Sequence, residues 1–489
     1  MHSALECEDI FQAICSALEA PGRLETLAAL AITCKALSEP ALDALWEELR
    51  NFDCLLNLLP RDLFVEFAWD FARPIMPVDW TRPHFYASRV KKLLISWESN
   101  RISQVMEILK AIGPFYPSGG LLPNLRYLGF NDQYEYPCRD LTSLRILLHL
   151  QVKEVSLSFS PSIANLSFLS ALPVMCPHLT HVDLSFRGEE YCPEAAAVVS
   201  TLVPTLQALE SLCFNANLDV GALNLGLLPN LIALSLEGRT ELIAGSFPRL
   251  RELTILDIDT VSVIQLFRSA ADLGLVKLDL GLSPATSSPR MAKLVRVLKS
   301  VASPTSLKTL TLRPPFGYVD TIPADRIMAD VLRGLSFFCA LTNVIIKWSF
   351  GPDIDDSTLG LLTESWTQLR NLQLQQIQAN TNLTLKSLLA LARNCPYLHH
   401  LELMVDASHV PELPPIAPQR TLTHMHVVSS PIQSATKVAR YISGIFPDVE
   451  HIWSSTEFPE RRRLWDQVLE QLPEFVAVRK EEVEKARTG

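Results

Sequence analysis

The chain carries a recurring six-residue pattern with apolar side chains at the first, fourth and sixth positions. It is plainest in LRYLGF at 125–130, LTHVDL at 179–184 and LHHLEL at 398–403. Apolar residues at alternating positions predict a short strand with one buried side. The motifs begin at residues 90, 125, 152, 179, 209, 231, 250, 275, 307, 341, 369, 398, 422 and 449. Their mean spacing of about 28 residues indicates an internal repeat.

Segments with helical spacing of apolar residues separate many of these motifs. The clearest are residues 102–112, 193–209, 261–273 and 386–395. A strand followed by a helix, repeated, buries one side of each unit only when neighbouring units stack. With this spacing, the chain resembles leucine-rich-repeat proteins. The resemblance implies an α/β solenoid with parallel strands on a concave face and helices outside, and a generic α/β sheet is the alternative.

The first 50 residues lack the repeat and predict three helices, at 9–18, 23–37 and 41–49. Pro21-Gly22 separates the first two, and Ser38-Glu39-Pro40 begins the third, because serine caps a helix and proline fits its first turn. Helices this short bury little apolar surface alone. We therefore expect them to pack on a partner or on the next domain.

The segments DIFQAICSAL and LAALAITCKALSEPALDALWEEL, within residues 5–50, resemble the F-box of fungal F-box proteins. The likeness lies in the Ile10-Phe11 pair, the leucine-rich run that ends in Cys34-Lys35, and the closing Leu45-Trp46. It departs where Leu5 is followed by glutamate instead of proline. The resemblance implies that this module docks on the adaptor subunit of a cullin-type (SCF) ubiquitin ligase while the repeats bind a protein substrate.

The adaptor contacts that the resemblance implies are apolar side chains of the three helices. They are Leu5, Ile10, Ile14, Leu18, Leu27, Leu30, Cys34, Leu45 and Trp46. Some of them, Leu30, Cys34 and Leu45 above all, could instead form the core of the module. Leu45 and Trp46 are the expected hot spot, because a large aromatic side chain at the centre of a desolvated patch dominates binding.

These patterns divide the chain into four parts. They are an F-box-like helical module at 1–50, a helical connector or N-terminal cap at 51–89, the solenoid at 90–457, and a C-terminal capping helix with a tail at 458–489. Leu464, Val468 and Leu469 share one face of the last helix, and Pro473 is expected to interrupt it. A cap covers the last repeat; a helix for binding a partner is the alternative.

The third and fifth motif positions face outward on adjacent strands and predict the substrate-binding surface. The candidates at these positions are Asp183, Glu252, Gln373, His400, Glu402, His424, His426 and His451, and two further candidates, Arg313 and Lys347, directly follow their motifs. Acidic residues predominate in the first half, and histidines in the last three motifs. If the strands are in register, His400, His424 and His451 form a ladder. Three interpretations stay open: solvated histidines stacked by register, a pH-dependent contact, or a divalent-metal site.

Composition narrows the class of protein. The 489 residues include 43 Lys+Arg and 53 Asp+Glu, a net charge of −10, which argues against nucleic-acid binding. The ten cysteines form no CxxC pair, the N-terminus is acidic, and no stretch is apolar enough to cross a bilayer. We therefore expect a cytosolic or nuclear protein that binds no membrane, in which the sequons at Asn165 and Asn382 stay unmodified.

Motifs for catalysis are absent from the sequence. There is no G-x-S-x-G, no G-x-x-x-x-G-K-[ST] and no H-E-x-x-H. We expect a non-enzymatic protein without a cofactor or metal. The rival to a ligase subunit is a repeat-based scaffold or inhibitor whose first helices merely cap the solenoid. Such a cap would bury Ile14, Leu27, Leu45 and Trp46 against the repeats, whereas a docking module would leave an apolar patch exposed.

Overall fold

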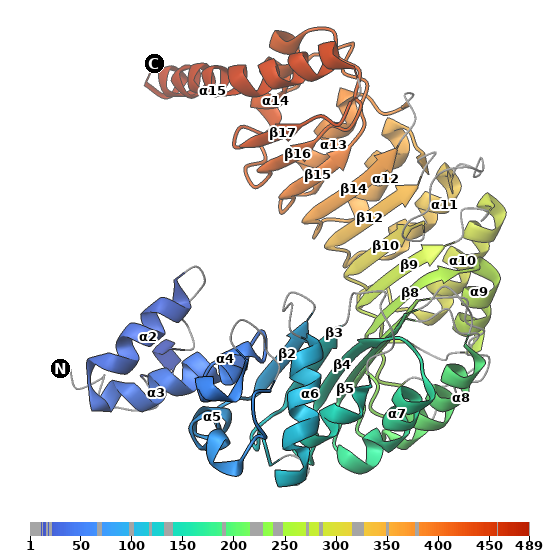
Figure 1. Cartoon of the computed structure of the whole chain (residues 1–489). Helices are drawn as coiled ribbons and strands as arrows, with labels where there is room; N and C mark the ends of the chain where they lie inside the picture. Colours follow the sequence, from blue (N-terminus) through green and yellow to red (C-terminus); the bar gives the residue numbers. More distant parts are fainter. Residues whose placement is uncertain are drawn as a thin grey trace. The chain divides into compact units, whose positions relative to one another are not determined.

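The computed structural model divides the chain into two compact units, Met1–Leu223 and Asn224–Gly489 (Figure 1). The described residues are 11, 13–15, 18, 22–65, 71–96, 102–116, 120–131, 140–187, 192–215, 228–237, 248–269, 273–282, 287–314, 327–348, 352–376, 381–456 and 458–488.

The first unit combines N-terminal helices with a parallel sheet. Its strands are β1 (Glu48–Leu49), β2 (Lys92–Ser96), β3 (Tyr127–Asn131), β4 (Glu154–Phe159), β5 (His181–Phe186) and β6 (Ser211–Asn215). Its α-helices are α2 (Arg23–Thr33), α3 (Lys35–Trp46), α4 (Asp53–Leu56), α5 (Thr81–Ala87), α6 (Ile102–Ile112), α7 (Ile163–Met175) and α8 (Pro193–Leu202). The strands pair in sequence order, each parallel to the next. Pro204, with no N–H to donate, accounts for α8 ending before the predicted residue 209.

The break between the second and third predicted helices is at Cys34, not at Ser38-Glu39-Pro40. Cys34 is extended, and its carbonyl oxygen accepts from the N–H groups of Leu37 and Ser38. Pro40 lies buried inside α3. The turn at Cys34 lets Leu37 of α3 join Leu27 of α2 in one core, so packing overrides the helix-starting preference of proline. The other buried members of this core are Phe11, Cys15, Ala41 and Ala44.

The sheet begins earlier than the sequence predicts. Glu48 and Leu49 of β1 pair with Lys92 and Leu93 of β2. The first strand therefore lies inside the segment assigned to the N-terminal module, and residue 90 is not the start of the solenoid. The connector at 51–89 contains α4, α5 and the short 3₁₀ turns Arg61–Leu63 and Pro77–Trp80.

The second unit repeats the strand–helix alternation. The strands of its main sheet are β7 (Ala233–Glu237), β8 (Glu252–Ile258), β9 (Lys277–Leu282), β10 (Thr309–Arg313), β12 (Asn343–Trp348), β14 (Asn371–Gln376), β15 (His400–Leu403), β16 (His424–His426) and β17 (His451–Trp453). Its helices are α9 (Thr260–Ser269), α10 (Ser288–Val301), α11 (Ala329–Gly334), α12 (Asp356–Ser365), α13 (Leu385–Asn394), α14 (Ala435–Ile445) and α15 (Pro459–Thr488). A two-stranded sheet pairs β11 (Ile327–Met328) with β13 (Pro352–Asp353).

Within each unit the strands are in the register that the repeated motif predicts. Leu310, Val344 and Leu372, for example, occupy the fourth motif position on adjacent strands, and all three are buried. Side chains at the third and fifth positions are on the opposite side and mostly remain partly exposed. We call that side the open face. Figure 1 shows α6–α8 in the first unit and α12–α14 in the second on the other side. The fold is a leucine-rich-repeat solenoid, as predicted.

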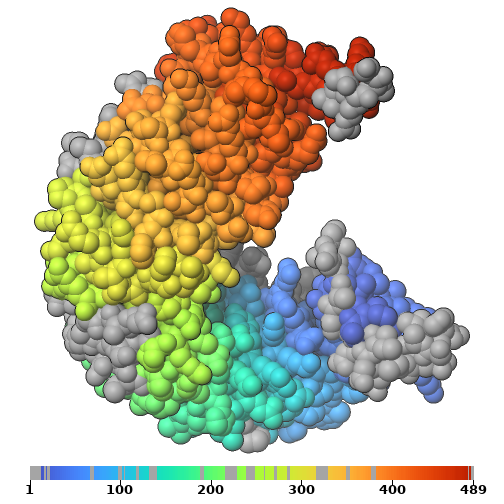
Figure 2. Space-filling model, turned by 180° about the vertical axis from the view of Figure 1, so that it is seen from behind, coloured from blue at the N-terminus to red at the C-terminus, as the bar shows by residue number. Residues whose placement is uncertain are grey.

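The C-terminal helix α15 packs on α14 and β17 and covers the last repeat. In Figure 2 its red surface lies against the orange surface of the last repeats. Its buried side chains are Trp465, Val468 and Leu472, a face shifted from the predicted one. The helix continues through Pro473, whose side is exposed, and Arg479 bonds to Ser443 and to the carbonyl of Arg440. The predicted interruption is therefore wrong, and α15 continues to Thr488.

Asn165 is a fully buried polar side chain of the first unit. Its Oδ1 accepts from the backbone N–H of Leu141 at 2.9 Å, and its Nδ2 donates to the carbonyl of Ser160 at 3.1 Å. We expect Asn165→Ala to lower the free energy of unfolding by about 1–3 kcal/mol, because it leaves a buried N–H unpaired. Urea unfolding measures the loss. The exposed control Gln151→Ala should change little, and an unaltered Asn165→Ala protein would contradict this account.

No helix among the described residues has both the length and the apolar character needed to cross a membrane.

Candidate functional site

The histidine ladder exists on the open face of the second unit. His400 pairs with His424, and His424 pairs with His451, on β15, β16 and β17. The ring centroids of His400 and His424 lie 6.2 Å apart, and those of His424 and His451 lie 4.9 Å apart. Trp453, which the sequence analysis did not select, stacks with His451 at 5.6 Å and is 45% exposed. The ladder therefore continues into a large exposed aromatic side chain.

Glu402 follows His400 by two residues on β15 and is in register with His426 on β16. Glu402 is 6% exposed, and its Oε1 lies 3.7 Å from Nδ1 of His426. The neighbouring His426 imidazole holds the pKa of Glu402 below its usual range, against the opposing effect of burial. Burial lowers the pKa of His400, and the charges of His424, His426 and Lys347 act in the same direction, while Glu402 opposes them.

The side chains of the described residues include no group of three or more histidine, cysteine or acidic residues placed to hold a metal ion. The rings of His400 and His424 are stacked, and those of His424 and His451 are tilted by 46°. Of the three interpretations, stacking by register and pH-dependent contact are the two that this geometry favours.

The two lowered pKa values give the second unit a pH-dependent stability. In both groups folding disfavours the protonated form, so the unfolded chain binds more protons and stability falls as the pH falls. For His400 the loss begins near its ordinary value of 6.5, and for Glu402 it begins below 4.5. We expect His400→Gln to flatten the fall in the urea midpoint between about pH 7 and pH 5. The exposed control His409→Gln should keep the original slope, and an unchanged slope in His400→Gln would exclude this role.

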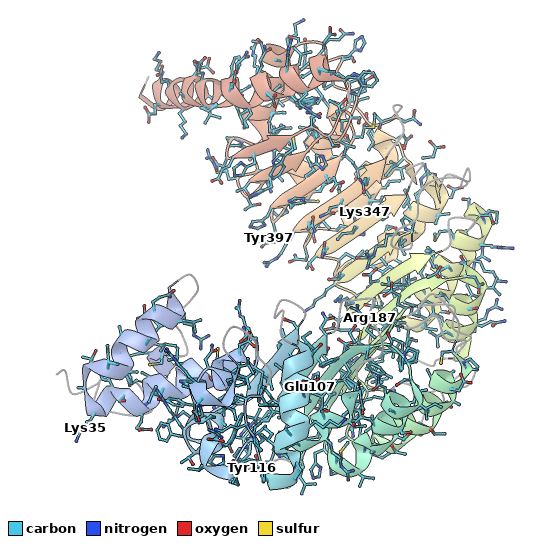
Figure 3. All side chains as sticks on the ribbon, viewed as in Figure 1. Lys35, Glu107, Tyr116, Arg187, Lys347 and Tyr397 are labelled. Atoms are coloured by element: carbon cyan, nitrogen blue, oxygen red, sulfur yellow. The ribbon has the colours of Figure 1, made fainter. Side chains whose placement is uncertain are left out.

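Several other predicted substrate contacts are already paired with neighbouring strands. Arg313 Nη2 lies 3.0 Å from Asp279 Oδ2, and Glu252 Oε2 lies 3.7 Å from Lys277 Nζ. Asp183 Oδ2 accepts from the hydroxyl of Ser156 at 3.0 Å. The two ion pairs neutralise part of the charge that the sequence predicts for this surface. Lys347 projects from β12 on the open face (Figure 3).

A row of amide side chains, from Asn343, Asn371 and Gln373, precedes the histidines. Asn371 Nδ2 donates to Asn343 Oδ1 at 2.7 Å, and Gln373 Nε2 donates to Asn371 Oδ1 at 3.3 Å. Of these, Gln373 was a predicted contact. Asn371 is in register with His400. The open face of the second unit thus presents hydrogen-bonding amides, then imidazoles, then an indole.

The predicted adaptor contacts separate into core and surface positions. Leu27 is fully buried, and Leu18, Leu30, Cys34 and Leu45 pack partly buried around the same core. These five residues therefore belong to the core of the module, which is the alternative that the sequence analysis left open. Leu5 and Ile10 lie outside the described residues.

Trp46 does not face a partner freely either. Its ring lies against that of Tyr86 near the end of α5, with centroids 4.5 Å apart and the ring planes tilted by 32°. Ile14, in contrast, is 42% exposed. The predicted hot spot around Leu45 and Trp46 is therefore engaged within the chain.

An exposed apolar surface lies on α2. The sequence analysis did not select its residues as adaptor contacts. Leu24 is 58% exposed and Ile32 is 87% exposed, with the exposed Ala28 between them. Residues four apart share one helical face, so these three form a continuous apolar stripe. We call it the α2 stripe. Its sequence signal is a helix whose apolar residues exceed what one buried face can use.

No protein-family model and no curated protein matches the chain. Two of the solved structures that resemble it are an internalin and a Rad7–Elc1 complex. The internalin, from Listeria monocytogenes, is 13% identical with a TM-score of 0.36, covering 77% of this chain and 89% of its own. The complex of Rad7 and Elc1 from yeast gives 15% identity and a TM-score of 0.40, covering 92% of this chain and 88% of that one.

Proposed function

We propose that this chain is a substrate-recruiting subunit of a cullin-type (SCF) ubiquitin ligase. In this proposal the N-terminal module is an F-box that docks on the adaptor subunit, and the open face of the repeats binds a protein substrate. The sequence likeness of residues 5–50 to fungal F-box proteins supports it. The observation that carries it is the α2 stripe, an exposed apolar surface on that module.

The energetics favour a protein partner on this stripe. Burying a leucine or isoleucine side chain contributes about 1.5–3 kcal/mol, so the exposed Leu24 and Ile32 represent a gain that the isolated chain does not realise. Of the four positions that a cap would bury against the repeats, Leu27 and Leu45 pack in the module's own core, Trp46 lies against Tyr86, and Ile14 is exposed. Leu24 and Ile32 are exposed as well.

The module is fixed to the first repeats. Arg89, which follows α5, pairs with Glu39 and Asp43 of α3, and Lys91 pairs with Glu47 at 3.1 Å. The side chain of Arg89 is only 11% exposed. Together with the pairing of β1 and β2, these contacts would hold a docked adaptor in a defined position relative to the first repeats.

Ubiquitin transfer would fall to the partner subunits, and this chain would act without catalysis, in the cytosol or the nucleus. The test is co-purification of the full chain with the purified adaptor, followed by gel filtration. A stoichiometric complex is the expected result. Failure of the folded wild-type chain to bind any adaptor would favour the scaffold or inhibitor function.

A further inference from the structure

The connection between β15 and β16 lacks the helix found in neighbouring repeats. Residues 404–423 contain no helix, and four prolines lie within them: Pro411, Pro414, Pro415 and Pro418. Proline fixes φ near −65° and keeps the preceding residue extended. Closely spaced prolines therefore favour a polyproline II helix, which has three residues per turn.

Leu413, Ile416 and Gln419, spaced three residues apart, are all at least half-buried. Gln419 is 5% exposed, its N–H donates to the carbonyl of Ile445 at 2.8 Å, and its side chain donates to the carbonyl of Leu398 at 2.9 Å. Three residues earlier Ile416 is half-buried. Another three earlier, the side chain of Leu413 lies so close to Gly444 of α14 that a methyl group there would collide with it. One edge of the segment is thus anchored on the protein itself.

On the other two edges of residues 414–420, only Pro414 is half-buried. Pro415, Ala417, Pro418 and Arg420 are all exposed. They form a ridge with the order Pro-x-x-Pro-x-Arg. Ala417, which precedes Pro418, faces solvent, and Gln419, which lies between Pro418 and Arg420, faces the protein. Pro418 and Arg420 also line a groove of about 400 Å³ whose other wall includes Val476, Arg479 and Lys480 of α15.

We propose that this ridge, residues 414–420, is a docking site for an SH3-type domain. Such domains bind Pro-x-x-Pro segments in polyproline II conformation, with the prolines in grooves lined by aromatic side chains. The exposed Arg420 two residues after Pro418 calls for an acidic pocket beside those grooves. Because the chain already holds the inward edge, little conformational entropy is lost on binding.

Arg420 can exchange its present ion-pair partner for a carboxylate of a bound domain. Its partner is Asp448, at 3.3 Å, and the two side chains are 55% and 40% exposed. A solvent-exposed ion pair of this kind contributes little to stability, so a carboxylate of a bound domain can replace it. The inference is independent of the proposed ligase function.

The experiment measures binding of the folded full-length chain to a purified SH3 domain selective for Pro-x-x-Pro-x-Arg peptides. A second SH3 domain, selective for the reversed order Arg-x-x-Pro-x-x-Pro, is the comparison. We expect wild-type chain to bind the first and prefer it. Arg420→Ala should weaken binding about tenfold or more, through loss of a charge-assisted contact, and Arg420→Lys should recover part of it.

Glu412→Ala is the matched control, since Glu412 is exposed in the same segment but lies outside the ridge. It should bind like wild type. Absence of binding by wild type, equal binding by Arg420→Ala, or a preference for the second domain would each overturn the proposal. Circular dichroism and the thermal midpoint establish that every variant compared is folded.

Discussion

A chain with Leu24→Asp and Ile32→Asp should lose adaptor binding by at least about a hundredfold. Both side chains project from one face of α2 into solvent, so aspartate is tolerated in the free chain. In the complex the two carboxylates would have to be desolvated against an apolar surface without a partner, which is costly. Titration calorimetry with the purified adaptor measures the change.

The matched control for this variant is Ile163→Asp. Ile163 is 86% exposed at the start of α7, where a carboxylate suits the helix N-terminus. It introduces the same chemistry away from the α2 stripe and should bind the adaptor like wild type. Equal binding by wild type and the double variant would exclude α2 as the docking surface.

Trp465→Ala should destabilise the second unit by about 3–5 kcal/mol. Trp465 is 1% exposed, and its indole N–H donates to the carbonyl of Ser430 at 3.0 Å. Ser430 is itself buried and accepts from the N–H of Val405 at 2.9 Å. Removing the indole would leave a cavity and an unpaired carbonyl under the element that covers the last repeat.

Two further variants separate the contributions of Trp465. Trp465→Phe keeps most of the apolar volume but loses the donor, and should cost about 1–2 kcal/mol. Val478→Ala, at a position of α15 that is 52% exposed, should stay within about 0.5 kcal/mol of wild type. Urea unfolding followed by circular dichroism gives all three values. A loss with Val478→Ala as large as with Trp465→Ala would contradict the capping role.

The repeat could be predicted because each strand carries its own signal. Alternating apolar residues fix which side of a strand is buried, and the motif fixes which positions are adjacent. His400, His424 and His451 could therefore be aligned from the motif alone, and they are in register on adjacent strands. Helix boundaries were less predictable where packing decides. Cys34 ends α2 because the core needs Leu37 in place, a long-range requirement that local preferences do not contain.

Two other features show the limits of local signals. Pro473 should interrupt a helix, yet α15 continues because its buried face, with Trp465 and Leu472, packs on α14 and β17 while the proline side is exposed. The pairing of Arg313 with Asp279 depends on side-chain conformation, which motif spacing does not define. The α2 stripe likewise could not be predicted without knowing which leucines are buried in the core.

We propose that the N-terminal module docks on a ligase adaptor through α2. Hydrogen exchange of the full-length chain, with and without the purified adaptor, tests it most directly. We predict that the backbone amides of Arg23–Thr33 gain protection when the adaptor is added, while those of helix α7 do not change. Unchanged exchange in α2 at saturating adaptor, or protection confined to the open face of the repeats, would contradict the account.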